Sequence, residues 1–288
     1  MRPTVKPMTP ALSPSRAADF KQCPLLYRFR VVDRLPSKPS PAAARGTLVH
    51  AVLEQLFDLP AMERTPDAAV ALIPGAWESL VEAEPALAAL ITEDESMSPG
   101  AWVADADALV RRWFTLEDPT RLAPADRELM IEVDVDGLTL RGIVDRLDVA
   151  PNGAMRVVDY KTGRSPREAF EGKALFQMKF YALVLWRLRG EVPKVLQLVY
   201  LGNGEVVRYV PDEHDLLALE RNVKAVWNAI ALAAETGDWR PRTSRLCDWC
   251  DFKSLCPAWG GTPPPLPGAA ASRAVAPEVT GEVTPGDD

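Results

Sequence analysis

Two aspartates and a lysine that could do chemistry lie on consecutive expected strands. Asp145 stands in the stretch GIVDRLD, and Asp159 stands in VVDYKTG with Lys161 two residues further on. Facing side chains of adjacent antiparallel strands lie about 5 Å apart, so the two carboxylates can converge. Carboxylate oxygens suit Mg²⁺ or Mn²⁺, and such a cation can activate water against a phosphodiester. Lys161 could steady the developing charge, although a solvated ion pair is the alternative.

His50 is the candidate third ligand. It is one of two histidines, and it falls within 44–57, where Leu and Val recur at helical spacing. His50 lies off that apolar stripe and shares a helix face with Glu54. A neutral imidazole could complete a metal site with the two aspartates. The alternative on sequence alone is an ordinary surface or core histidine.

The four cysteines are divided between the two ends of the chain. Cys23 stands alone before Pro24, and Cys247, Cys250 and Cys256 cluster near the other end. In an intracellular chain such a cluster favours metal binding over disulfides, and both zinc and an iron–sulfur cluster accept four thiolates. The layout predicts a clasp that closes the fold. We expect the aromatic residues of this segment to shield the centre rather than stack on bases; they are Trp249, Phe252 and Trp259.

Hydrophobic periodicity predicts the elements that position these residues. We expect a helix from Ser13 or Ser15 to about Tyr27, and an Ala-rich helical insertion over 67–117. A three-stranded meander follows, with an Asp-Gly turn signal at 136–137 and a second turn at 151–153. Its strands are expected at 129–135, 139–149 and 154–160, followed by a helix at 174–189, strands at 195–201 and 205–210, and a helix at 212–235.

Composition and charge bound the class of protein. The 288 residues are 47% hydrophobic and 25% charged, which is ordinary globular composition. No run of about 18 apolar residues and no secretory signal occurs, so we expect no membrane span and a cytoplasmic protein. The net charge is −7, but residues 1–36 carry seven Lys or Arg against two Asp, and 239–256 carry four against two. If the thiols share one centre, these segments form one positive surface; an acidic protein without a charged partner is the alternative.

Four motifs together resemble the RecB-type nuclease branch of the PD-(D/E)XK superfamily over residues 12–257. They are GTLVH ending at His50, GIVDR around Asp145, VDYKTG around Asp159, and Gln177 followed by Tyr181. The resemblance implies an α/β restriction-endonuclease-like core, in which helices flank a mixed sheet. Two departures are tolerated in this branch: no proline precedes Asp145, and the second acid is Asp rather than Glu.

The resemblance also implies roles for individual residues. His50, Asp145 and Asp159 would ligate Mg²⁺ or Mn²⁺ with help from the Val158 carbonyl, and Lys161 would be the catalytic lysine. Gln177 and Tyr181 would contact the DNA strand. The cysteine layout resembles the iron–sulfur staple of AddB-type and CRISPR-associated RecB-type nucleases. It implies a [4Fe–4S] cluster, favoured over zinc, on all four cysteines, namely Cys23, Cys247, Cys250 and Cys256.

The implied activity is metal-dependent DNA cleavage, exonucleolytic on single strands or ends, in repair or recombination. No GxxxxGK[ST] loop occurs, so a separate helicase subunit is a candidate partner. A CRISPR-adaptation nuclease and a non-catalytic DNA-binding subunit are the alternatives. We expect a flexible stretch at 1–12, one nuclease domain over 13–256, and a disordered acidic, Pro-rich tail at 257–288. Within the domain lie the helical insertion at about 60–120, the catalytic core at about 128–210 and the cysteine segment at 239–256.

Overall fold

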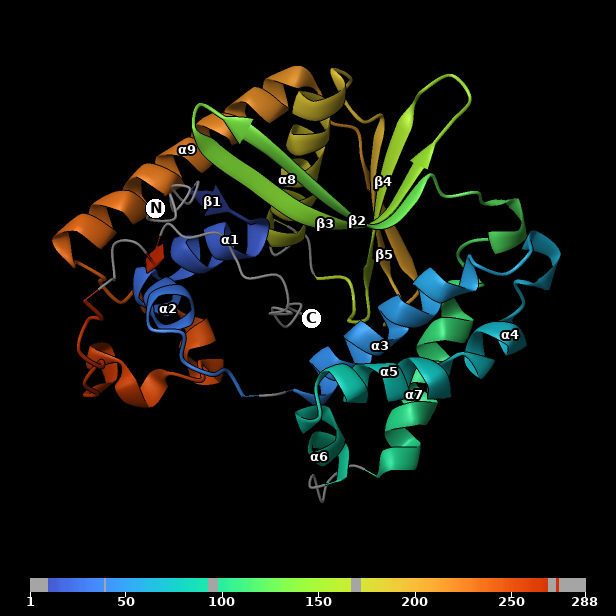
Figure 1. Ribbon diagram of the computed structural model, residues 1–288, viewed down its shortest axis with the longest axis horizontal. Coiled ribbons are helices and arrows are strands. Elements are labelled where there is room, and N and C mark those ends of the chain that lie inside the picture. The colour runs from blue at the N-terminus through green and yellow to red at the C-terminus, as the bar shows by residue number, and fades with distance from the viewer. Residues whose placement is uncertain (1–9, 39, 93–97, 167–171, 269–272, 275–288) are drawn as a thin grey trace, which may run out of the picture.

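A six-stranded mixed sheet forms the centre of the computed structural model, which describes residues 10–38, 40–92, 98–166, 172–268 and 273–274 (Figure 1). The strand order is β1-β3-β4-β5-β6, and β2 also pairs with β3. The β1–β3 and β4–β5 pairs are parallel and the others antiparallel. The strands are β1 (Ala11–Leu12), β2 (Asp126–Val135), β3 (Leu138–Val149), β4 (Met155–Lys161), β5 (Val195–Tyr200) and β6 (Glu205–Tyr209).

The predicted meander is confirmed as β2, β3 and β4. Asp136 and Gly137 both adopt positive φ (53° and 83°), the backbone that a tight hairpin turn requires. At the far end of β3, Arg146 lies opposite Val158 of β4. The β3–β4 pairing ends at this pair, and Asp145 and Asp159 are the next residues of the two strands, so both carboxylates lie at the end of the pairing.

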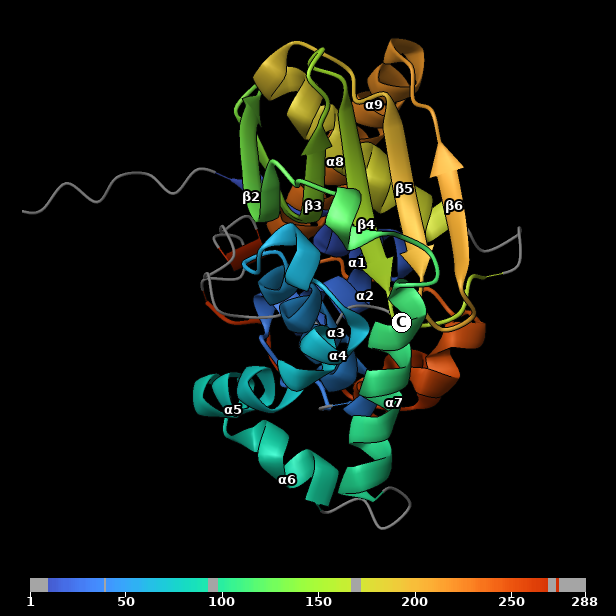
Figure 2. The same ribbon diagram turned by 90° about the vertical axis from the view of Figure 1, so that its right-hand side faces the viewer.

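Helices pack on both faces of the sheet: Figure 2 shows α8 and α9 behind the strands, and the helices around α3 at the lower end of the near face. A separate hydrophobic core lies on each face, and consecutive residues of β4 point into different cores. Val157 packs in the core with α8 (Gly172–Arg189) and α9 (Glu213–Thr236), whereas Val158 packs in the core with α3 (Pro41–Leu56). The predicted insertion forms four helices beside α3, and Figure 1 shows them on the side of the molecule opposite the cysteine segment. They are α4 (Pro66–Ala71), α5 (Ile73–Ala83), α6 (Ala86–Thr92) and α7 (Pro99–Trp113).

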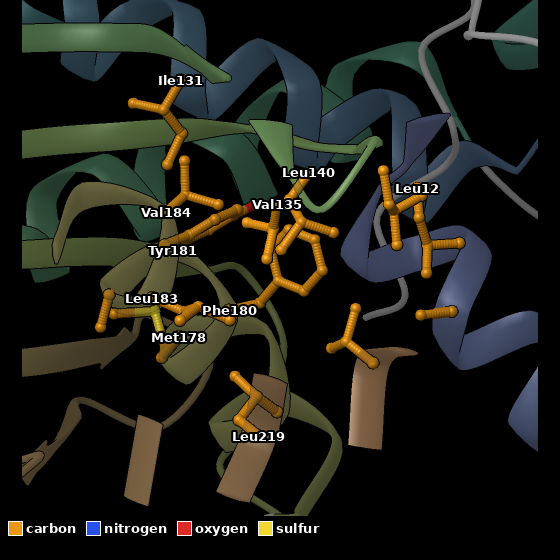
Figure 3. Close-up of a cluster of buried hydrophobic side chains, with 14 of the residues drawn as sticks. Leu12, Ile131, Val135, Leu140, Met178, Phe180, Tyr181, Leu183, Val184 and Leu219 are labelled. Atoms are coloured by element: carbon orange, nitrogen blue, oxygen red, sulfur yellow. The ribbon is translucent and has the colours of Figure 1, made fainter. Parts of the chain in front are cut away.

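The larger core lies between the sheet and α8. Figure 3 shows Leu12 of β1, Leu140 of β3 and Phe180 of α8 converging there, and each is at most 1% exposed. Full burial of a side chain of this size contributes roughly 1.5–3 kcal/mol relative to exposure. This packing fixes α8, which carries Gln177 and Tyr181, against the strand that carries Asp145.

The N-terminal helix is interrupted where one continuous helix was expected. Ser13 is the N-cap of α1 (Pro14–Gln22), and its hydroxyl accepts from the Arg16 amide. Cys23 then has extended backbone (φ −160°, ψ 114°) before α2 (Pro24–Tyr27). The residue before a proline is disfavoured in the α region, so Pro24 ends α1 and leaves the Cys23 side chain in a bend between two helices.

Described residues near the C-terminus pack onto α2 and the π-helical turn Arg28–Val32 that follows it. The Tyr27 hydroxyl donates to the Ala274 carbonyl (2.6 Å), and the Arg28 guanidinium donates to the Pro264 carbonyl. Residues 257–268, which composition assigns to the tail, are described and contact the domain, and β1 lies within the expected flexible N-terminus. Residues 1–9 and 275–288 are outside the described part. Among the described helices, none has the length and hydrophobicity to cross a bilayer.

Candidate active site

His50 of α3 and Asp145 of β3 meet at one end of the sheet. His50 Nδ1 lies 3.6 Å from Asp145 Oδ2, although 95 positions separate them in the chain. The Tyr160 backbone holds both side chains: its N–H donates to Asp145 Oδ2 (2.7 Å), and its carbonyl lies 3.0 Å from His50 Nε2. A carbonyl can only accept, so the Nε2 atom carries the proton and the Nδ1 lone pair faces the carboxylates. This tautomer suits a metal ligand.

Asp159 and Lys161 extend the site along β4. Asp159 is 2% exposed, and its Oδ2 lies 3.0 Å from Lys161 Nζ. Lys161 Nζ also donates to Gln177 Oε1 (3.0 Å), and Gln177 Nε2 donates to the Tyr181 hydroxyl (2.7 Å). Tyr181 is 5% exposed and lies against Gly142 of β3. The ammonium group is therefore oriented from two sides by a carboxylate and an amide.

Glu128 of β2 is a site residue that the sequence analysis missed. Its Oε1 lies 3.9 Å from His50 Nδ1. Among the described residues, His50, Glu128 and Asp145 form the set of ligand atoms that lie within 4.8 Å of one another. Glu128 has φ of 43°, an uncommon conformation for a residue with a side chain. Counting residue pairs back from the turn at 136–137 places Glu128 opposite Asp145, so the hairpin register contained a signal for it.

The electrostatics of this cluster favour a cation. Burial raises the pKa of Asp145 to about 6, and burial together with the Asp145 charge raises the pKa of Glu128 to about 7. Burial lowers the pKa of His50, but the carboxylates of Asp145 and Glu128 outweigh it, so the pKa is raised overall. Crowded carboxylates and an imidazole lone pair are a donor set for a divalent ion.

A buried ion-pair network supports the site from the other side of β3. Arg146, 1% exposed, donates from both terminal nitrogens to Glu117 (2.7 and 2.8 Å) and from Nη1 to the Tyr160 hydroxyl (2.5 Å). Its Nε lies 3.2 Å from Asp148. Glu117 follows α7, so the network ties the insertion to the residue that clamps His50 and Asp145.

The four cysteines line one hollow between α1, α2 and the segment 241–259. All four are free thiols. The Arg242 amide donates to Cys23 Sγ and the Ser244 amide to Cys247 Sγ, each at 3.3 Å. Burial raises the pKa of the Cys250 thiol, and the other three cysteines add to this effect. No three of the four sulfurs, all of which are described, lie within 4.8 Å of one another.

The aromatic residues of the cysteine segment differ in burial. Phe252 is 4% exposed and packs on Phe29, with ring centroids 5.4 Å apart, as the shielding prediction requires. Trp249 is 78% exposed and Trp259 is 50% exposed. The prediction that these tryptophans shield the centre is therefore wrong for Trp249, because the segment turns its side chain to solvent.

Comparison with known proteins gives the family. The family model of the PD-(D/E)XK nuclease superfamily matches residues 11–257. The chain belongs to this superfamily. It is 24% identical over 276 residues to the Gene 69 protein of Mycobacterium phage D29, covering 87% of this chain and 97% of that protein. It is 30% identical over 135 residues to the Gene 69 protein of Mycobacterium phage L5, covering 46% and 44%.

A solved structure shares the fold. The crystal structure named "Putative exonuclease" from Eubacterium rectale superposes with a TM-score of 0.54 at 14% identity, covering 84% of this chain and 87% of that one. Together with the family match, this establishes the expected fold class, a mixed sheet flanked by helices of the restriction-endonuclease-like type.

Proposed function

We propose that this chain is a metal-dependent deoxyribonuclease of the RecB type, an exonuclease that hydrolyses single-stranded DNA or DNA ends in repair or recombination. The observation that carries the proposal is the meeting of three elements: α3 supplies His50, β3 supplies Asp145, and β4 supplies Asp159 and Lys161. The superfamily match supports nuclease chemistry, and the name of the Eubacterium rectale protein agrees with the exonuclease mode.

His50, Asp145 and Asp159 would hold Mg²⁺ or Mn²⁺ with the Val158 carbonyl, and Glu128 lies within reach of the same ion. When bound, the cation supplies a Lewis acid and lowers the pKa of a coordinated water. The protein keeps the His50 Nδ1 lone pair directed at the site through the Nε2 bond to the Tyr160 carbonyl. The Tyr160 N–H fixes one Asp145 oxygen in the same way.

Lys161 would place a positive charge beside the scissile phosphate. Asp159 and Gln177 orient its ammonium group at 3.0 Å each, so the charge is in place before the substrate arrives. We propose that Gln177 contacts the DNA strand directly. The resemblance implied a DNA contact for Tyr181 as well. Because the Tyr181 side chain is 5% exposed and its hydroxyl accepts from Gln177 Nε2, its proposed role is instead to hold Gln177 in position.

The cysteine hollow would hold a [4Fe–4S] cluster on Cys23, Cys247, Cys250 and Cys256. The layout of one N-terminal cysteine and three C-terminal cysteines is the reason for preferring this cluster to zinc. Amide donors to two of the sulfurs are the kind of hydrogen bond that tunes iron–sulfur centres. The cluster would join the N-terminal helices to the C-terminal segment.

The test is digestion of end-labelled single-stranded and duplex DNA with Mg²⁺ or Mn²⁺. The wild-type protein should cut, chelation by EDTA should stop it, and Asp159→Ala should lose cleavage while still binding DNA. Glu132→Gln, an exposed carboxylate change on β2, is the matched control and should retain activity. Full activity of Asp159→Ala would remove these residues from the mechanism, and an inactive wild-type protein would refute the nuclease proposal.

A further inference from the structure

Exposed tryptophans on the cysteine segment are left unused by the site described above. Trp249 is 78% exposed and Trp259 is 50% exposed. Lys253 lies between the two tryptophans in the chain and contacts the neighbourhood of both. Its Nζ lies 4.3 Å from the centroid of the Trp259 ring and 2.8 Å from Asp248, the residue before Trp249. Large aromatic side chains presented to solvent beside cations commonly mark interaction surfaces.

A series of contacts connects this surface to Lys161 of the proposed catalytic centre. Gln177, which binds Lys161, follows Phe176, and Lys21 Nζ lies 4.2 Å from the centroid of the Phe176 ring. The Lys21 carbonyl accepts from the Arg242 guanidinium. Arg242 lines the cysteine hollow together with Lys253 and Trp259. We call this series the basic–aromatic tract; its members are Gln177, Phe176, Lys21, Arg242, Lys253 and Trp249.

The charge of the tract contrasts with that of the whole chain. The chain carries −7, whereas the described residues 10–36 carry five Lys or Arg against two Asp, or +3, and residues 239–256 carry +2. These two segments lie side by side, because the Arg242 amide bonds Cys23 Sγ, and Figure 1 shows the cysteine segment beside α1 and α2. A positive surface on an acidic protein favours an anionic partner.

We propose that one strand of single-stranded DNA runs along the basic–aromatic tract, from Lys161 to Trp249. Lys21, Arg242 and Lys253 would follow the phosphates, and a base would stack on the open Trp249 ring. Cations spaced along a surface with bare aromatic rings are the arrangement that proteins use for unpaired strands, since a duplex buries its base faces. This inference rests on the proposed function, because it deepens the substrate class of that site.

The test is fluorescence anisotropy with labelled oligo-dT in the Asp159→Ala background, which prevents cleavage. Adding Trp249→Ala should weaken binding at least about fivefold, because one stacked base contributes about 1–3 kcal/mol. Trp249→Phe should retain most of the affinity. Lys21→Ala should reduce the slope of log K against log salt by about 0.7, whereas Trp249→Ala should leave the slope unchanged. Met62→Ala, 82% exposed on the insertion side, is the control and should bind normally.

The outcomes separate this inference from the proposed function. Unchanged affinity and salt slope in folded Trp249→Ala and Lys21→Ala proteins would overturn the tract, even if the wild-type protein cleaves DNA. Trp249-dependent binding by a wild-type protein that does not cleave would support the tract and refute the nuclease proposal. If the Trp249→Ala and Lys21→Ala proteins lose affinity for oligo-rU as much as for oligo-dT, the tract binds single-stranded RNA as well as DNA. If Trp249→Ala does not fold, Lys21→Ala, an exposed change, decides the question through its salt slope.

Discussion

Glu117→Gln is the substitution that best tests the support beneath the active site. The Glu117 carboxylate is 8% exposed and accepts from four donors: Arg146 twice (2.7 and 2.8 Å), Trp113 Nε1 (2.9 Å) and Gln197 Nε2 (3.1 Å). The substitution keeps the shape but replaces one acceptor with an NH₂ donor. It leaves the buried Arg146 guanidinium without its full counter-charge.

The expected magnitude follows from that burial. Removing one partner of a buried ion pair costs about 3–5 kcal/mol, because the remaining charge stays desolvated. Arg146 retains Asp148 and the Tyr160 hydroxyl, so we expect the lower end of this range, about 3 kcal/mol. This is a large share of the roughly 5–15 kcal/mol by which domains are stable. The Tyr160 backbone should also hold His50 and Asp145 less firmly, so the affinity for Mn²⁺ should fall.

Urea unfolding measures the first effect, and Mn²⁺ titration of the folded protein measures the second. Asp67→Asn is the matched control: Asp67 pairs with Arg111 at 2.9 Å on the surface, where its side chain is 89% exposed. It should change the free energy of unfolding by less than about 1 kcal/mol. If Glu117→Gln unfolds within about 1 kcal/mol of the wild-type protein, the buried network does not support the site as argued.

Three further results are expected. Gly142→Ala would place a Cβ 2.5 Å from Tyr181 Cε1, so it should lower the melting temperature, whereas Gly100→Ala, with open space around it, should not. Burial raises the pKa of Glu117, but its bonds to Arg146 lower that pKa below 4.5 overall. The stability that the ionised Glu117 contributes is therefore complete above about pH 4.5 and is lost as the pH falls through the lowered pKa. In urea titrations, acid should destabilise the Glu117→Gln protein less steeply than the wild-type protein. Cys23→Ser should lower the iron content and the absorbance near 400 nm of anaerobically purified protein, and unchanged iron would exclude Cys23 as a ligand.

The β-hairpin geometry was predictable because local signals determine it. The Asp136–Gly137 turn requires positive φ at both positions, and the side-chain alternation of the strands then fixes the register. The β3–β4 pairing follows the second turn at 151–153 and has a register of its own, and Asp145 and Asp159 are the residues just beyond its last pair, Arg146 and Val158. The roles assigned to the individual site residues remain predictions, since the geometry shows their proximity and not their chemistry.

Three other features were missed from the sequence, each for a different reason. Glu128 enters the site through an unusual backbone conformation at the start of β2, outside the expected strand. The interruption at Cys23 follows from Pro24, a local signal that the helical periodicity of the flanking residues obscured. Trp249 was expected to pack, but burial depends on how the segment between the cysteines turns, and no periodic pattern encodes that turn.

The contacts of α2 with the C-terminal residues bear on where the chain can be shortened. A truncation at residue 257, which composition alone would recommend, removes the carbonyl partners of Tyr27 and Arg28. Tyr27 stacks on Trp239 with ring centroids 6.0 Å apart, next to the helices that present Cys23. A trimmed protein would therefore expose a buried aromatic pair to water, and loss of metal from such a sample would reflect the cut rather than the chemistry of the thiols.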